Sequence, residues 1–139
     1  MAAPVELLEQ VPLFQGLSGK VLKGVAQSFT ERKFETGQEI TSEGAGGVGF
    51  FVIGSGEVVV TVGGEERRRL GPGGYFGEIA LVDGGARTAT VTATSGGTMY
   101  GLTAWQFRPL VEAEASIAWP LLETMAARLR ELEQHTATP

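Results

Sequence analysis

Apolar residues at both ends of the chain follow the spacing of amphipathic helices. A short helix is expected after Pro4, and a second from Gly19 to about Ser28, with Ser18 as its N-cap. Near the C-terminus, Thr103 can cap a third helix, and a longer one follows from about Ser116 to Glu133. The apolar residues of this last helix are spaced alternately four and three apart, as in the seam of a coiled coil: Ala118, Leu122, Met125, Leu129 and Leu132.

Between these ends the pattern changes to short extended segments separated by glycine-rich turns. Their regular spacing predicts a mainly β fold, an antiparallel jelly-roll β-barrel with N-terminal helices before it and two C-terminal helices after it. The expected strands are Phe29–Phe34, Glu39–Thr41, Phe50–Ile53, Glu57–Val62, Glu65–Leu70, Arg87–Ala93 and Thr98–Leu102.

Three pairs of neighbouring strands are expected to form hairpins. Phe50–Ile53 and Glu57–Val62 flank the turn Ser55-Gly56, and Glu65–Leu70 returns along Glu57–Val62 after Gly63-Gly64. A further hairpin is expected between Arg87–Ala93 and Thr98–Leu102, around Ser95-Gly96-Gly97.

At 139 residues the chain has the size of one domain. We expect a single domain over 1–139, with N-terminal helices in 1–28, the β-barrel in 29–102 and the C-terminal helices in 103–134. The apolar fraction of 42% and the charged fraction of 19% are typical of a chain with a buried core. The 21 glycines are about twice the usual share of roughly 7%, in keeping with many tight turns.

Composition removes several classes of function. The chain has no Cys and a single His, His135, so thiol chemistry and metal sites built from several imidazoles are excluded. We expect no metal, no cofactor and no catalytic residue. No apolar run of about 18 residues exists and no basic segment precedes an apolar one near Met1, so we expect a cytoplasmic protein without a membrane segment. The net charge of −5 disfavours nucleic-acid contact by this chain.

The segment 76–89 carries the most specific chemistry. A glycine-rich turn leads into a short helical piece near Glu78, whose first amides lack intrahelical acceptors and can therefore bind an anion. Gly77 lets the backbone approach a ligand closely. Arg87 offers a planar guanidinium suited to two phosphate oxygens, whereas the Glu78 carboxylate can only accept, as from sugar hydroxyls. This combination favours a phosphorylated ribose over free phosphate.

Phe76–Leu81, followed by Arg87-Thr88-Ala89, resembles the phosphate-binding cassette of cyclic-nucleotide-binding domains. This family includes bacterial catabolite activator proteins, protein kinase A regulatory subunits and cyclic-nucleotide-gated channels. The resemblance extends over nearly the whole chain and includes the segment Phe51–Val58 and the trailing helices.

The resemblance implies a role for each matched residue. Arg87 would hold the exocyclic oxygens of the cyclic phosphate, Glu78 would accept from the ribose 2′-hydroxyl, and Val60 would line the base side of the pocket. The implied ligand-binding positions are completed by amides near Gly77, Ile79, Ala80 and Thr88, and by Ala89. In the family the last helix closes the pocket, which makes lid candidates of Leu129, Arg130, Leu132 and Glu133.

Two features depart from the family's pattern: the residue after Arg87 and the loop 44–49. Thr88 stands where several members have Ala or Ser; its hydroxyl can bond phosphate in any ligand, and in some members it favours the guanine 2-amino group. Cyclic AMP is favoured and cyclic GMP stays open, because threonine also occurs in members that prefer cyclic AMP. The loop 44–49 is almost all glycine and uncharged, which concerns loop mobility rather than ligand identity.

Other prominent residues have structural interpretations. The run Arg67–Arg69 follows Glu65-Glu66 on an expected edge hairpin and is interpreted as a solvated, self-neutralised edge. Trp105 and Trp119 are expected to pack the C-terminal helices against the barrel, although Trp119, directly before Pro120 near a helix start, could be partly exposed. The seam of the last helix can pack on its own barrel or pair with a second copy as a homodimer, and the pattern leaves both open.

These observations predict a ligand-sensing module without chemistry of its own. It would bind a 3′,5′-cyclic purine nucleotide and move its C-terminal helices to cover the base. The alternative is the N-terminal sensor part of a DNA-binding regulator of the catabolite-activator kind, whose helix-turn-helix would have to follow in a longer reading frame. A metal-dependent enzyme on a jelly roll needs clustered His ligands, which a single His135 excludes.

Overall fold

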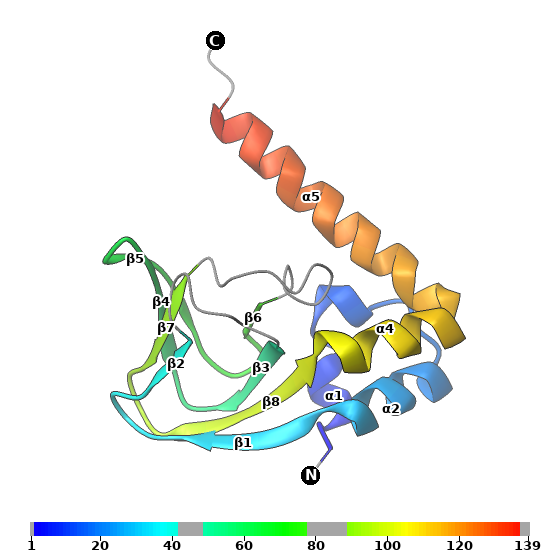
Figure 1. The fold of residues 1–139 in the computed structure, drawn as a ribbon, viewed down its shortest axis with the longest axis horizontal. Helices are drawn as coiled ribbons and strands as arrows, with labels where there is room; N and C mark the ends of the chain where they lie inside the picture. The colour runs from blue at the N-terminus through cyan, green and yellow to red at the C-terminus, as the bar shows by residue number, and fades with distance from the viewer. Residues whose placement is uncertain (1, 42–48, 78–88, 137–139) are drawn as a thin grey trace.

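The computed structural model describes residues 2–41, 49–77 and 89–136 (Figure 1). The chain begins with three short helical elements, α1 (Val5–Leu8), the 3₁₀ turn η1 (Pro12–Phe14) and α2 (Gly19–Ser28). As predicted, Ser18 caps α2: its hydroxyl oxygen accepts from the Val21 amide at 3.3 Å.

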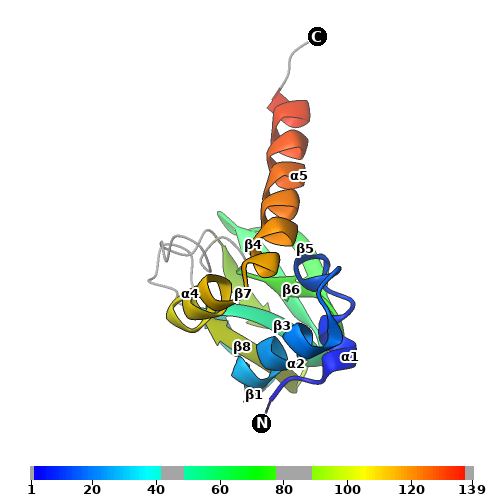
Figure 2. The same ribbon diagram turned by 90° about the vertical axis from the view of Figure 1, so that its right-hand side faces the viewer.

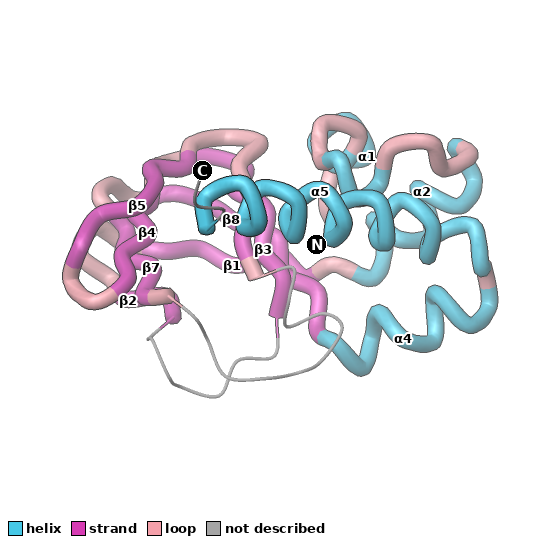
Figure 3. The backbone as a smooth tube through the Cα atoms, turned by 90° about the horizontal axis from the view of Figure 1, so that it is seen from above, coloured by secondary structure: helices cyan, strands magenta, loops and turns pink. Residues whose placement is uncertain are grey.

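The strands form two antiparallel four-stranded sheets, which confirms the mainly β jelly-roll fold with flanking helices. Figure 3 shows the strands gathered at one end and α1, α2 and α4 at the other, with α5 crossing the view from the helical end towards the strands. The first sheet has the order β1-β8-β3-β6, made of Thr30–Phe34, Gly97–Thr103, Gly49–Ser55 and Tyr75–Phe76. The second has the order β2-β7-β4-β5, made of Glu39–Thr41, Thr90–Ala93, Val58–Val62 and Glu65–Leu70.

Two of the three predicted hairpins are wrong. β3 pairs with β8 and β6, whereas β4 pairs with β7 and β5, so consecutive strands β3 and β4 belong to different sheets. The same holds for β7 and β8. The sequence pattern of a strand, a glycine turn and a second strand is the same whether the two strands pair within one sheet or belong to two different sheets. The hairpin of β4 and β5 is confirmed, with Gly63 and Gly64 at φ +60° and +80°.

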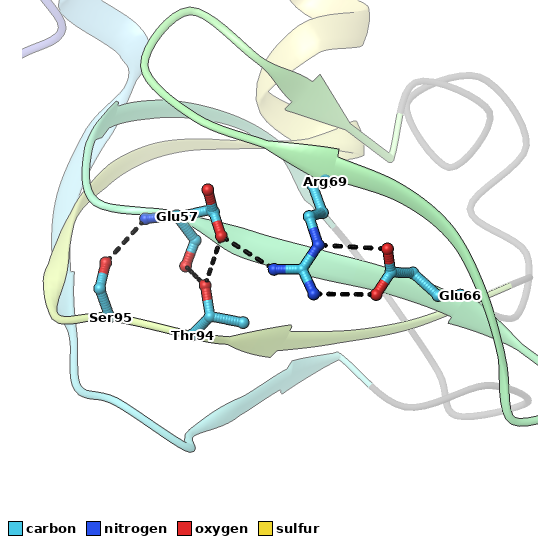
Figure 4. A network of polar contacts seen from close by, with 5 residues as sticks. All are labelled: Glu57, Glu66, Arg69, Thr94 and Ser95. Carbon is cyan, nitrogen blue, oxygen red and sulfur yellow. Dashed lines mark hydrogen bonds and ion pairs between the residues drawn. The ribbon is translucent and has the colours of Figure 1, made fainter.

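The two corners between the sheets lie against each other. A Cβ atom on Gly56 would come within 2.6 Å of the Gly96 carbonyl oxygen. On the other side of the contact, the Glu57 amide donates to the Ser95 hydroxyl at 2.9 Å, and the Thr94 hydroxyl donates to the Glu57 carbonyl at 3.1 Å (Figure 4). Backbone contact and side-chain hydrogen bonds therefore join the two sheet-to-sheet connections.

β3 is buried on both faces and separates two apolar cores. Its Phe50 and Val52 face the helices, where Phe50 meets Phe14 edge to face with ring centroids 5.9 Å apart. Phe51 and Ile53 face the barrel interior instead. Burial on both faces explains why this strand reads as a continuous apolar run rather than an alternating one. The barrel interior consists of Phe34, Phe51, Ile53, Val58, Val60, Phe76, Val91, Ala93 and Met99.

The C-terminal part comprises α4 (Ala104–Ala113), the 3₁₀ turn η2 (Ala115–Ile117) and α5 (Ala118–Thr136). Thr103 caps α4 as predicted, in a reciprocal capping box with Gln106. α5 starts beside the N-terminal helices and then extends away from the body of the domain (Figures 1 and 2). Within the described parts of the chain, no helix is long and apolar enough to cross a membrane.

The predicted packing of Trp105 is wrong, because its side chain is 67% exposed. Trp119, whose place before Pro120 allowed partial exposure, is 66% exposed. Each helix instead buries smaller residues beside its tryptophan: Phe107 in α4, Ile117 directly before α5, and Leu121 within it. The buried stripe of a surface helix is narrow, and the sequence pattern does not tell which of two neighbouring large residues occupies it.

Tyr100 of β8 should lower the stability of the fold at alkaline pH. Its hydroxyl donates to a Glu31 carboxylate oxygen at 3.4 Å. Burial, the negative charge of Glu31 and this hydrogen bond all raise the pKa of Tyr100 above 10.0. As pH rises from about 10 towards the folded-state pKa, the unfolded chain releases this proton before the folded protein does, so the free energy of unfolding falls.

Tyr100→Phe should remove this part of the pH dependence. We expect urea denaturation to show a steeper stability loss for the wild type than for the variant between about pH 9 and pH 11, since other groups titrate alike in both. Parallel slopes would mean that Tyr100 has the same pKa in the folded and unfolded states.

Candidate functional site

Five of the predicted ligand-binding residues lie outside the described residues: Glu78, Ile79, Ala80, Arg87 and Thr88. The residues on either side of them are described. Gly77 follows β6 at φ +90°, a left-handed conformation that favours glycine, and Ala89 directly precedes β7. The structure therefore shows how the two ends of the segment are held.

The two ends belong to different sheets. On the side of Gly77, Phe76 pairs with Phe51 of β3, and their rings lie 5.2 Å apart in the barrel interior. On the other side, the Ala89 carbonyl accepts from the Thr41 hydroxyl at 3.4 Å, and the Ala89 side chain packs against the same interior. Phe76 and Ala89, on the two sides of residues 78–88, are thus attached to different sheets, and both lie against the core that the sheets share.

Val60, the predicted base-side residue, lies on the inward face of the second sheet. It is only 5% exposed and stands opposite Val91 of β7 and Arg68 of β5. Its place in the barrel interior agrees with an apolar wall, and its role in ligand binding stays a prediction.

All four lid candidates are exposed on the outer part of α5, with Leu129 at 62% and Leu132 at 61%; the others are Arg130 and Glu133. None of them lines the groove of about 620 Å³ that separates α5 from η1 and the barrel. A different side of α5 lines it, with Glu123, Thr124, Ala127, Arg128 and Glu131. The role of the four lid candidates in closing over a ligand stays a prediction.

Arg67 and Arg69 confirm the interpretation of β5 as a self-neutralised edge. Arg69 donates to both carboxylate oxygens of Glu66 and to Glu57, all at 3.1 Å (Figure 4). The hydrogen bonds and charge of Glu66, followed by those of Glu57, raise the pKa of Arg69. Arg67 lies 4.0 Å from Glu65. Ion pairs this exposed contribute little to stability.

Arg68 does not fit that interpretation. It lines the groove beneath α5 together with Tyr75 of β6 and Gln15 beside η1. In the sequence, the three arginines form one run of like charges that does not distinguish them. The alternation of side chains along a strand, with Leu70 as the next inward residue, was the signal that could have separated Arg68 from its neighbours.

The described residues offer little for metal chemistry. No group of three or more His, Cys, Asp or Glu side chains is placed to hold a metal ion in the parts of the chain that the structure describes.

Comparison with known proteins identifies the family. The cyclic nucleotide-binding domain family matches residues 31–114, which include both described ends of the segment and everything between them. The chain belongs to this family.

Relatives and solved structures agree with the assignment. A cAMP-dependent protein kinase regulatory subunit from Yarrowia lipolytica is 34% identical over 71% of this chain and 26% of its own length. The crystal structure of the Thermus thermophilus catabolite activator protein superposes with a TM-score of 0.80 at 31% identity, over 89% of this chain and 61% of that one. The regulatory domain of Toxoplasma gondii PKA, crystallised with cAMP, gives a TM-score of 0.71 at 34% identity, over 81% and 44%.

The relatives are longer than this chain. It spans between 26% and 59% of the length of the first curated relatives that it matches.

Proposed function

We propose that the domain is a non-catalytic sensor that binds a 3′,5′-cyclic purine nucleotide, prefers cyclic AMP to cyclic GMP and relays binding through its C-terminal helices. The observation that carries the proposal is the cassette sequence, Phe76–Leu81 with Arg87–Ala89, inside the matched region and with one end on each sheet. Relatives that bind or are named for cAMP support the preference. The cytoplasmic location stays an expectation from the sequence.

The residue roles follow the chemistry of the ligand. A guanidinium at Arg87 supplies two parallel donors and a positive charge to the cyclic phosphate. The Glu78 carboxylate accepts from the ribose hydroxyl, and the amides near Gly77, Ile79, Ala80, Thr88 and Ala89 complete the anion cradle. Val60 offers the base an apolar surface next to the barrel interior.

The relay rests on how α5 is attached. Its first turns are held by Leu121, which is buried, and by Met125, which packs against the helical core. Beyond Met125 the apolar residues of the seam are exposed. A helix anchored at one end can change its angle when a ligand contacts it, and binding then shifts the population of helix positions.

A second candidate function is the sensor part of a transcription regulator. It is favoured by the match to the Thermus thermophilus catabolite activator protein, of which this chain covers 61%. The same ligand site would then control DNA binding by a part outside this chain.

Calorimetric titration with cyclic AMP and cyclic GMP tests the proposal. We expect saturable binding of both, with cyclic AMP tighter. Absence of binding heat with both nucleotides would overturn the proposed function, and tighter binding of cyclic GMP would reverse only the preference.

The exposed seam of α5 makes homodimer formation a specific expectation. Leu122, Leu129 and Leu132 are each more than half exposed, and pairing with a second copy would remove them from water. Leu129→Glu places a charge in that contact and should convert a dimer to a monomer in light scattering. Gln134→Glu adds the same charge to α5 outside the seam and should leave the dimer intact. A wild type that is monomeric at high concentration would refute the dimer.

A further inference from the structure

Thr41, the last residue of β2, is bonded to the described end of the segment expected to bind the ligand. Its hydroxyl donates to the Ala89 carbonyl oxygen at 3.4 Å. Ala89 directly precedes β7, whose pairing with its neighbours begins at Thr90. The Thr41 hydroxyl therefore fixes a backbone carbonyl that lies one residue before the paired part of the sheet.

A β-bulge sets the direction of the Thr41 side chain. Glu39 of β2 stands opposite Thr92 of β7. Two residues further along β2, Thr41 stands opposite Val91, so β2 has one residue more than β7 over this stretch. Val91 is buried in the barrel interior, and opposed residues of an antiparallel pair point to the same face. The bulge thus brings Thr41 to the inward face, whereas a regular register would place it opposite Thr90 and turn it outward.

From Thr90 onward the backbone is held by the other neighbouring strand. β7 lies between β2 and β4 in the second sheet (Figure 1). Thr90 pairs with Thr61 of β4, whose hydroxyl donates to the Thr90 carbonyl oxygen at 3.5 Å. The bond from Thr41 to Ala89 extends this fixed backbone by one residue, in the direction of Arg87 along the chain.

Bidentate binding by an arginine depends on the position of its backbone. The guanidinium is a planar fork, and its two parallel bonds to phosphate oxygens require a matching orientation. A lysine ammonium is a compact charge on a flexible stem and tolerates a displaced backbone better. Arg87 precedes Ala89 by only two residues, so a fixed Ala89 limits the positions from which the Arg87 side chain can start.

We infer that Thr41 is a positioning residue, which fixes the backbone at Ala89 so that Arg87 meets the cyclic phosphate with both of its donors. The inference rests on the proposed function and adds to it a residue from a strand distant in sequence. Thr41 acts through the Ala89 carbonyl and needs no contact with the ligand.

Two other roles of the Thr41 hydroxyl make different predictions. A hydroxyl that donated directly to the ligand would contribute the same factor whatever side chain stands at position 87. A hydroxyl that only stabilised the fold would change the melting temperature of the free protein and leave the affinity of the folded protein unchanged.

Calorimetric titration of Thr41→Val with cyclic AMP tests the inference, since valine has nearly the shape of threonine without the hydroxyl. We expect the affinity to fall by roughly 2- to 12-fold, which corresponds to the net contribution of one hydrogen bond. Thr41→Ser keeps the hydroxyl and should restore most of the affinity. The melting temperature of free Thr41→Val should stay within about 4 °C of the wild type, because water can solvate the partly buried carbonyl.

The same substitution in an Arg87→Lys background identifies how Thr41 acts. There the bidentate fork is already lost, so we expect Thr41→Val to lower the affinity by less than about 1.5-fold. A direct contact between Thr41 and the ligand would instead give the full loss in both backgrounds.

Thr92→Val is the matched control. It makes the same substitution in β7 on the outward face, since Val91 and Ala93 are the inward residues, and should leave the affinity unchanged. Unchanged affinity of Thr41→Val, a loss that Thr41→Ser does not restore, or a full loss in the Arg87→Lys background overturns the role of Thr41 and leaves the proposed function standing. A wild type that binds neither cyclic AMP nor cyclic GMP overturns the proposed function itself.

Discussion

Arg87→Leu should lower the affinity for cyclic nucleotide by roughly 30- to 3,000-fold and leave the melting temperature of the free protein nearly unchanged. On the proposed role, Arg87 supplies the counter-charge of the phosphate, and breaking one side of such a pair in a partly dry site costs roughly 2–5 kcal/mol. At about 1.4 kcal/mol per tenfold change, this corresponds to the stated range. An arginine whose only role is to pair with a ligand has no buried partner in the free protein, so its removal strands no charge there.

Calorimetry and thermal unfolding of the same samples measure both quantities. Arg87→Lys should recover part of the affinity, because lysine keeps the charge but not the bidentate geometry. Arg108→Leu serves as the control, since it removes a charge from the exposed face of α4, where the Arg108 guanidinium lies 3.6 Å from the Glu112 carboxylate. Intact affinity together with a large loss of stability would show that Arg87 is a framework residue.

Gly97→Ala should destabilise the fold by about 3 kcal/mol or more, the upper end of what overpacking costs. A Cβ at this position would run into the Ser55 carbonyl oxygen, and would lie 2.8 Å from the Gly56 Cα and 2.7 Å from the Phe34 ring. Two of these three neighbours are backbone atoms of the opposing corner and cannot rotate away. The corners between the sheets must separate to admit a single methyl group.

Gly96→Ala provides the control for this prediction. The nearest atom to its Cβ would be the Phe34 carbonyl oxygen at 3.6 Å, an ordinary contact, so we expect a change within about 0.5 kcal/mol. Urea denaturation of both variants gives the free energies of unfolding. Equal stability of the two proteins would mean that the corners have more room than the structure shows.

Features that depend on a few neighbouring residues could be predicted from the sequence. Ser18 and Thr103 were placed correctly as helix caps, because a cap needs only a side-chain oxygen and an amide two or three residues ahead. The β4–β5 hairpin followed from its turn Gly63-Gly64. The cassette 76–89 was found for the same reason, since its Gly, Glu and Arg lie within one short segment.

The pairing of strands could not be predicted in the same way. β3 and β4 are adjacent in sequence and lie in different sheets, whereas β3 and β8 pair although Phe50 and Leu102 are far apart along the chain. Such pairing depends on the burial of both faces of β3 between two cores, which no local pattern records. The exposure of Trp105 and Trp119 has a similar origin, because it depends on how far each helix is rotated against its neighbours.

For this protein, the sequence alone determined the two helix caps Ser18 and Thr103, the β character of the middle and the family. All of these rest on interactions between near neighbours or on a motif read along the chain. Only the tertiary structure decided that the ends of the cassette sit on two different sheets, that Gly97 has no room for a side chain, and that Arg68 faces the groove while Arg69 turns away from it. These features depend on cross-strand register and on contacts between distant segments, and such contacts exist only once the two sheets have packed together.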